Sequence, residues 1–379
     1  MKRLIFFIFG LILILECQGQ LVKGPPSCRR VKKWPFLKTS IWNIPIGSNA
    51  KYHPQPIDKK HISGIHADLD IIILTPDAPK MNVYGTKYRW QSGTNKKTRC
   101  KKHNDIIHLS LPIPKNYVTL FHKQSRPNNA AVIMRSNEHT LVQTQPFQVC
   151  EGGYATTGLK RPSGEYINEI LRASDVDIYG KGRAGMHGGS GLSTLGGAIR
   201  LGELTSPNID AMRHALKISF PGEHYLYYNH ETNKGYRWPA LKHDSHAEDK
   251  YNSTNPEAYI GCLRALKPDL NIEDLNLETL PGKKLAWTLK NYGAYQVEGV
   301  PWSKMMIAVE EGPNGSVVEE FKEKYGWDFV STDKASNPWL RDCMKIIQHL
   351  YIVENNRKST PGGGGEPLQP LAPPFSSSK

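Results

Sequence analysis

Residues 126–145 read RPNNAAVIMRSNEHTLVQTQ and contain the pattern that decides the fold. Two short apolar runs, Ala130–Met134 and Thr140–Gln145, are separated by the polar turn Ser136–His139, and Arg126–Asn129 supplies a turn before them. Short runs rich in Val, Ile and Thr that lie between Asn, Pro and Ser residues are typical of β-strands. This stretch therefore predicts two successive strands.

The same pattern recurs on both sides of this stretch. Further strands are predicted at Asp70–Thr75, Ile106–Pro112, Ala215–Phe220 and Met305–Glu310. Because strands do not alternate with helices, a doubly wound parallel sheet is disfavoured. The predicted fold class is mainly β, a single sandwich or jelly-roll-like domain with a few bracing helices.

Three segments have apolar residues at helical spacing: Lys283–Tyr292, Val317–Tyr325 and Pro338–Val353. The turn Leu280–Gly282 precedes the first of them, and Gly293 is a good stop signal at its end. We expect these helices to brace the sheets and to carry no function of their own.

The two ends of the chain differ from its middle. Residues 1–20 combine a basic start with the twelve-residue apolar run Leu4–Leu15, which predicts a secretory signal peptide that is too short for a membrane anchor. The predicted organisation is a signal peptide (1–20), an extended basic arm (21–60), a mainly β domain (61–356) and a Gly/Pro/Ser-rich tail (357–379). The mature chain is predicted to be secreted and extracellular, without a membrane span.

The charge of the chain points to an anionic partner. The 379 residues include 49 Lys and Arg against 35 Asp and Glu, a formal net charge of +14. Removal of residues 1–20 leaves 47 bases, 34 acids and a charge of +13. A secreted protein rarely meets nucleic acid, so the basic character predicts an acidic polysaccharide or an acidic extracellular matrix as partner. The basic run 95–102 is either a contact for such a glycan or a solvated loop.

Cysteine usage fits an oxidising compartment. Signal cleavage leaves five cysteines, and this odd number predicts two disulfides and one leftover thiol, with Cys100–Cys150 as the preferred pair. No CxxC motif occurs, so a thiolate zinc site is not predicted. Asn252-Ser253-Thr254 and Asn314-Gly315-Ser316 are glycosylation sequons, which matter in a eukaryotic host.

A glycine-rich segment, Asp175–Leu204, is the most distinctive part of the sequence. Gly180, Gly182 and Gly185 match the dinucleotide pattern GxGxxG, but more glycines follow where a helix has to begin, so no nucleotide cofactor is predicted. The run Gly188–Leu192 lacks the final glycine of a nucleophile elbow. The glycines either allow strands to pack around a tight corner or expose the backbone beside a ligand.

Four polar residues of this region are the candidate catalytic residues: His187, Arg200, Glu203 and His214. In a polysaccharide lyase, a cation neutralises the uronate carboxylate and a His or Tyr base removes the acidified proton at C5. Glycoside hydrolysis would instead need two facing carboxylates. The nearby acids Asp175, Asp177, Glu203 and Glu223 are available for that role.

A second polar segment, His243–Asp249, offers weak metal-binding features. Its two histidines, His243 and His246, would share one face of a helix and could then bind a divalent ion. The HExxH motif is absent, however, and the segment is better explained as a solvated polar loop. No metal and no other cofactor is predicted.

Three stretches together resemble a family of secreted, mostly bacterial proteins that has no established activity. They are SIWNIPIG (40–47), HGGSGLS (187–193) running on to IRLGEL (199–204), and LETLPGKKLAW (277–287) with NYGAY (291–295). The resemblance covers most of residues 38–375, and the tail 362–374 looks like the ending of the family. It implies a secreted, mainly β, carbohydrate-related protein, and it supplies no catalytic residue.

Two function classes follow from these observations. The first is a carbohydrate-active enzyme acting on an acidic glycan, a polysaccharide lyase before a glycoside hydrolase. The second is a non-catalytic extracellular matrix or polysaccharide-binding protein. An enzyme should bring a base, an arginine and a carboxylate together in one cleft. A binding protein should use these residues in internal hydrogen bonds.

Overall fold

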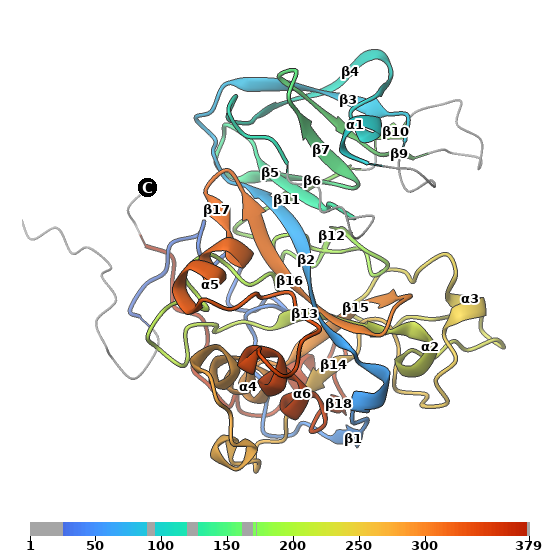
Figure 1. Cartoon of the computed structure of the whole chain (residues 1–379), viewed down its shortest axis with the longest axis vertical. Coiled ribbons are helices and arrows are strands. Elements are labelled where there is room, and N and C mark those ends of the chain that lie inside the picture. Colours follow the sequence, from blue (N-terminus) through green and yellow to red (C-terminus); the bar gives the residue numbers. More distant parts are fainter. Residues whose placement is uncertain (1–25, 89–94, 120–127, 161–169, 172, 377–379) are drawn as a thin grey trace, which may run out of the picture.

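The computed structural model describes residues 26–88, 95–119, 128–160, 170–171 and 173–376. The predicted signal peptide, residues 1–20, lies outside this range. The chain is mainly β, with mixed sheets and few helices, which confirms the predicted fold class of a sandwich with bracing helices (Figure 1).

Within the described residues the largest sheet has eleven strands and mixed direction. The pairs β13/β15, β16/β2 and β2/β5 are parallel, and the other pairs are antiparallel. In sheet order the strands are β1 (Tyr52–Pro54), β18 (Tyr351–Val353), β14 (Leu263–Ala265), β15 (Ala294–Val300), β13 (Leu216–Pro221), β16 (Lys304–Gly312), β2 (Gly64–Ile73), β5 (Ala131–Met134), β6 (Thr140–Thr144) and β11 (Ala173–Asp177), with β17 (Gly315–Ser316) paired to β16.

A smaller sheet packs onto one end of the large one. Its strands, in order, are β4 (Lys102–Pro112), β3 (Lys80–Thr86), β8 (Tyr154–Thr157) and β7 (Phe147–Cys150). Val83, Leu111 and Val149 of this sheet share a buried cluster with Ile71 and Ile133 of the large sheet. The two sheets therefore form the sandwich at the upper end of the molecule in Figure 1. Two short strands, β9 (Leu159–Lys160) and β10 (Ile170–Leu171), pair with each other, and β12 (Ala184–His187) lies in the glycine-rich segment.

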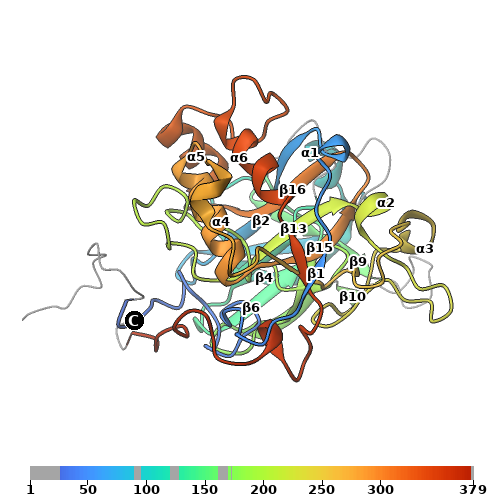
Figure 2. The same ribbon diagram turned by 90° about the horizontal axis from the view of Figure 1, so that it is seen from below.

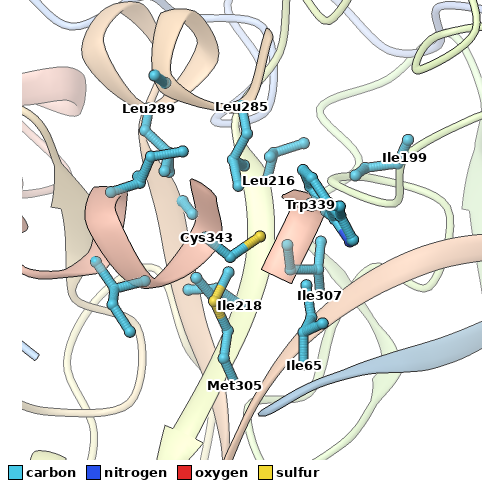
Figure 3. Packing of buried hydrophobic residues seen from close by; sticks show 14 of the residues in the cluster. Ile65, Ile199, Leu216, Ile218, Leu285, Leu289, Met305, Ile307, Trp339 and Cys343 are labelled. Carbon is cyan, nitrogen blue, oxygen red and sulfur yellow. The ribbon is translucent and has the colours of Figure 1, made fainter. Parts of the chain in front are cut away.

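Helices cover one face of the other half of the large sheet. Leucines of α4 (Leu280–Asn291) and Trp339 and Cys343 of α6 (Pro338–Ile347) pack onto apolar residues of β13, β16 and β2, as Figure 3 shows. The third long helix, α5 (Val317–Tyr325), adds Phe321 to this core. The remaining helices are short: α1 (Lys96–Arg99), α2 (Gly222–Tyr225), α3 (Ala247–Lys250), η1 (Lys59–His61), η2 (Ile272–Leu275) and η3 (Pro361–Gly363).

Local signals explain where the long helices begin and end. The Thr279 hydroxyl accepts a hydrogen bond from the Gly282 amide and caps α4, and Asn337 caps α6 in the same way. The predicted helix over 338–353 is too long, because α6 ends at Ile347. The residues after it leave the helical path and form β18, where Tyr351–Val353 pair with β1 and β14. Sheet pairing therefore overrides the helical spacing of these apolar residues.

The predicted arm and tail lie side by side and close the opposite face of the sheet (Figure 2). The Arg29 guanidinium stacks over the Phe375 ring at 3.8 Å and its Nε donates to the Pro373 carbonyl at 2.7 Å. Further along, the Gly47 amide donates to the Gly362 carbonyl. The arm also adds β1 to the large sheet. Buried apolar residues of the arm and the glycine-rich segment pack there against β2, β5 and β15.

Cys100 and Cys150 form the predicted disulfide, which joins the segment before β4 to the end of β7. The second predicted bridge does not form among the described cysteines. Cys262 and Cys343 are buried in separate apolar clusters, which places their sulfur atoms in different parts of the molecule. A disulfide is typical of proteins that fold in an oxidising compartment. None of the described helices is both long enough and apolar enough to cross a bilayer.

Candidate functional site

The two faces of the central strands differ sharply in polarity. In β2 the side chains of Ala67 and Leu69 belong to the core beneath the helices, whereas Asp68 and Asp70 alternate with them and point to the other face. In β13 the same alternation places Lys217 on the polar face and Leu216 and Ile218 on the face beneath the helices. These charged residues are buried, because the arm and the glycine-rich segment cover the face on which they lie.

A β-bulge brings Glu298 onto this polar face. In the pairing of β13 with β15, Ile218 is opposite Gln296 and Ser219 is opposite Glu298, so Val297 is the extra residue. A bulge turns the following side chain relative to regular alternation, and such irregularities are common beside functional sites. Glu298 is only half-buried, and its two carboxylate oxygens accept hydrogen bonds from Asn128 Nδ2 at 2.7 and 2.9 Å.

His187, at the end of β12, lies between the two aspartates of β2. Its Nδ1–H donates to Asp70 Oδ1 at 2.9 Å, and its Nε2 lies 3.2 Å from Asp68 Oδ2. The contact of Nε2 is an ion pair without good hydrogen-bond geometry, so this nitrogen, on a side chain that is 2% exposed, has no hydrogen-bond partner among the residues that the structure describes. Asp70 is held in turn by Lys217, whose Nζ lies 2.6 Å from Asp70 Oδ2.

Asp244 is the third carboxylate of this site and comes from the loop before α3. Its Oδ2 accepts hydrogen bonds from the Gly299 amide at 3.0 Å and from the Tyr251 hydroxyl. The glycine-rich segment runs between the acids, because a Cβ at Gly188 would lie 2.7 Å from Glu298 Oε2 and one at Gly189 would lie 2.3 Å from Asp244 Oδ1. Only glycine allows the backbone to come this close to both acids. Asp68, His187, Asp244 and Glu298 are called the carboxylate centre below.

Burial and like charges perturb the titration of this centre. Burial together with the neighbouring carboxylates Asp244 and Asp68 raises the pKa of Glu298 to about 8. Burial opposes the charge of His187, but Asp70 and Asp68 outweigh it and raise the pKa of His187 to about 9. Burial opposes the charge of Asp68 as well, and His187 nevertheless lowers its pKa. The two acids beside His187 therefore differ in acidity although they lie close together.

Asp68, His187 and Glu298 also form a candidate metal site. One carboxylate oxygen of each acid and one ring nitrogen of His187 lie within 4.8 Å of one another. Two acids and one imidazole are a reasonable ligand set for a divalent ion. His243 and His246, for which the sequence favours a polar loop over a metal site, are not part of this group. His243 stacks edge-on against Tyr228, and His246 is exposed.

The other three predicted catalytic residues form a separate group. Arg200 Nε donates to Glu310 Oε2 at 2.8 Å, and the Arg200 amide donates to Glu203 Oε2 at 2.7 Å. His214 Nε2 lies 3.2 Å from both oxygens of Glu203. Arg200, Glu203, His214 and Glu310 are called the arginine cluster below. Each of its bases has an acid of its own, so the structure brings these residues together in internal contacts.

The arginine cluster borders a small pocket beneath the arm. Arg200 and His214 form one wall of it, and aromatic residues of the arm form another. Both polar side chains are nine-tenths buried. The residues of this pocket are Lys33, Trp34, Pro35, Phe36, Trp42, Asn43, Leu195, Gly196, Gly197, Ala198, Arg200 and His214.

Of the four residues predicted from the sequence, His187 alone lies in the carboxylate centre. Asp68, Glu298, Asn128 and the role of Asp244 were not predicted. The sequence did contain a signal for Asp68. It lies two residues before Asp70 in the mostly apolar strand GIHADLDIII, so both carboxylates lie on the same face of that strand. Glu298 carried no such signal, because its direction depends on the bulge at Val297.

The described chain was compared with known proteins in three ways. No protein-family model, no curated protein and no solved structure matches it.

Proposed function

We propose that the protein is a secreted hydrolase that cleaves an acidic polysaccharide, with its reaction centre at Asp68, His187, Asp244 and Glu298. One observation carries the proposal: three carboxylates and an imidazole converge on one face of the sheet, and acids outnumber the bases that could neutralise them. Core packing does not require such an arrangement, because burying charges of like sign destabilises a fold. Arrangements of this kind are concentrated at functional sites.

Hydrolysis fits this centre better than elimination does. A lyase needs a free base together with a cation that is available to the uronate carboxylate. Both ring nitrogens of His187 face aspartates, and the nearby cations Arg200 and Lys217 are engaged by Glu310 and Asp70. Carboxylates are the plentiful groups, and they are the groups that glycoside hydrolysis uses to activate water and to protonate the leaving oxygen.

The charge of the chain supports an acidic substrate. The centre is locally negative, whereas the chain as a whole has a formal charge of +14. An anionic polymer is attracted to a protein of net positive charge, and the acids of the centre would act on the glycosidic bond. The predicted signal peptide and the disulfide are consistent with work outside the cell.

The alternative function is a non-catalytic protein that holds polysaccharide or matrix. It predicts that polar residues are used in internal contacts, and the arginine cluster has this property. The carboxylate centre has it only in part, because Glu298 is incompletely buried and its partner is the amide of Asn128 instead of a base. This difference favours the enzyme.

The experiment is to incubate the purified chain with uronate-containing and sulfated polysaccharides. We expect new reducing ends without the ultraviolet absorbance of unsaturated products, because hydrolysis creates no double bond. Glu298→Gln should remove the activity, and Glu248→Gln, an exposed acid near the loop of Asp244, should leave it unchanged. If wild-type protein binds these glycans in pull-down but both signals stay at blank level, the binding function is correct and the enzyme is not.

A further inference from the structure

We infer that Asp68, His187 and Glu298 bind a divalent transition-metal ion, with one carboxylate oxygen from each acid and Nε2 of His187 as ligands. The inference rests on the proposed function only for the reaction that the ion would serve. Binding of the ion itself is a separate property of these side chains and can be measured without any glycan.

The first argument is the geometry around Nε2 of His187, the imidazole nitrogen that lies beside Asp68 without forming a hydrogen bond. His187 Nε2 is buried, has no hydrogen-bond partner in the described part of the chain and lies 3.2 Å from Asp68 Oδ2. Two ligand atoms that each lie about 2.1 Å from one ion, at angles between octahedral and tetrahedral, are separated by about 3.0–3.4 Å. The third ligand, a Glu298 oxygen, lies within 4.8 Å of a ring nitrogen of His187 and of a carboxylate oxygen of Asp68. The pair is therefore spaced like two ligands of one ion.

The second argument is the set of residues behind the ligands. His187 donates its other ring N–H to Asp70, which is fixed by Lys217. A carboxylate behind the histidine is the usual outer partner of a metal-bound imidazole, since it fixes the tautomer that leaves Nε2 free for the ion. Asn128 performs the corresponding task for Glu298, because its amide holds both carboxylate oxygens in one orientation.

The third argument is local charge. The four acids of the site, Asp68, Asp70, Asp244 and Glu298, face a single buried ammonium, that of Lys217. An ion bound by these ligands requires neutral His187 and ionised Glu298, so it would displace a proton from each; in that state the group has a charge of −3, and a divalent ion reduces it to −1. A cation removes the repulsion that the protein alone leaves in place.

The ligand set selects the class of ion. Imidazole nitrogen favours zinc and related transition metals, and carboxylate oxygen is accepted by zinc and manganese. Calcium takes six to eight oxygen ligands, and magnesium keeps several waters and prefers oxygen alone. One nitrogen and two carboxylates therefore point to Zn²⁺ or Mn²⁺. Bound there, the ion would acidify a water molecule for attack, so Asp68 and Glu298 would act as its ligands and Asp244 would be the carboxylate left to protonate the leaving oxygen.

The test uses purified full-length chain that has been stripped of metal with a chelator. Zn²⁺, Mn²⁺, Ca²⁺ and Mg²⁺ are added separately, and binding is followed by titration calorimetry and by the melting temperature. We expect one equivalent of Zn²⁺ or Mn²⁺ to bind and to raise the melting temperature. Asp68→Asn and Glu298→Gln should each weaken this binding by about 100-fold or more, because each removes a ligand.

Two matched variants separate ligand loss from general damage. Asp70→Asn keeps all three ligands and should weaken binding by about 10–100-fold, as loss of an outer partner does. Glu248→Gln should bind as the wild type does. The inference is overturned if neither Zn²⁺ nor Mn²⁺ binds the wild type, if Ca²⁺ or Mg²⁺ binds more tightly than both, or if Glu298→Gln binds as the wild type does.

The same measurements keep the two proposals apart. One equivalent of zinc or manganese in a protein that cleaves no glycan supports the metal site and contradicts the proposed hydrolase. Glycan cleavage that persists at full rate in chelator supports the hydrolase and overturns a catalytic ion at this site.

Discussion

The carboxylate centre and the arginine cluster start from neighbouring positions of the same sheet, yet they are built in opposite ways. Asp70 of β2 and Glu310 of β16 are register partners. Glu310 is neutralised directly by Arg200, and Glu203 is paired with His214. Asp70 likewise has Lys217, but three further acids, Asp68, Asp244 and Glu298, lie near it, and His187 is the additional base, in contact with Asp68 and Asp70.

This difference separates a stabilising arrangement from a functional one. Buried ion pairs between one acid and one base hold the glycine-rich segment to the sheet. Removal of one partner leaves the other charge buried without a counter-ion. A surplus of acids does nothing for folding and is retained where chemistry needs it. Variants of Asp68, Arg200, Glu311 and Glu298 distinguish the two arrangements.

The largest effect is expected from Asp68→Asn, measured as activity. The change keeps the shape of the side chain but removes a charge that touches His187, so kcat/KM should fall by about 1,000-fold or more. The free energy of unfolding should change by only about 1 kcal/mol, because His187 retains Asp70. Glycan assays and urea unfolding measure the two quantities. If the variant instead loses so much free energy of unfolding that unfolding alone explains the lost activity, Asp68 is a structural residue.

Arg200→Met tests the opposite side of the comparison. It leaves the Glu310 carboxylate buried without its base, so the free energy of unfolding should fall by about 3–5 kcal/mol. The matched control is the double variant Arg200→Met, Glu310→Leu, which removes both charges and should recover most of the loss. If Arg200→Met unfolds at the wild-type urea concentration but has lost its activity, Arg200 serves the reaction and the comparison fails.

Glu311 provides a third kind of buried acid, which has a hydroxyl partner but no base. Burial and the nearby acids Glu319 and Glu310 raise the pKa of Glu311 to about 7, although its hydrogen bond to Ser316 opposes this. The folded state then binds the proton more tightly than the unfolded state. The stability that this group contributes is therefore complete below about pH 4.5 and is lost as the pH rises to about 7.

Glu311→Gln should consequently raise the free energy of unfolding by about 2 kcal/mol at pH 8, with little change near pH 4. Melting curves at several pH values measure the effect, and Ser316→Ala at the same pH values is a control that should lower stability in the upper range. An equal effect of Glu311→Gln at pH 4 and pH 8 would show that packing is responsible and that charge is not.

The smallest effect concerns stability at the carboxylate centre itself. In chelator, at a pH above the pKa of about 8 that burial and the neighbouring acids Asp244 and Asp68 give Glu298, Glu298→Gln should raise the free energy of unfolding by about 1 kcal/mol, because it removes one of several like charges and leaves Asn128 a carbonyl to bind. Thermal melts of this variant and of Glu248→Gln give the comparison. A clear loss of stability in Glu298→Gln would mean that its carboxylate is a structural acceptor.

Much of the fold could be predicted from short stretches of sequence. The strand runs at 130–134 and 140–145 and the helix α5 agree with the structure because apolar spacing and turn residues act locally. The disulfide Cys100–Cys150 agrees as well, because the two cysteines flank a strand-rich stretch. The end of α6 could not be predicted in this way, since β18 forms only when β1 and β14 are present.

The candidate site depends even more on distant parts of the chain. Arg200 and Glu203 were attractive as catalytic residues because they follow His187 in a glycine-rich segment, but the partner of Arg200 is Glu310, more than 100 residues away. Asp68 and Glu298 meet only after β2, β16, β13 and β15 have assembled. A local sequence pattern therefore could not predict that these two side chains are close in space.

The contact between arm and tail has a consequence for the order in which the molecule is completed. Arg29 and Pro373 are 344 positions apart, and their hydrogen bond joins the first and last described segments. A ribosome delivers residue 29 long before residue 373, so the arm has to wait, undocked, while nearly the whole chain is made. Closure over the sheet is thus a late, long-range event, which favours slow folding. If the chain crosses a membrane starting from its N-terminus, the contact between arm and tail cannot form until the residues of the tail have crossed.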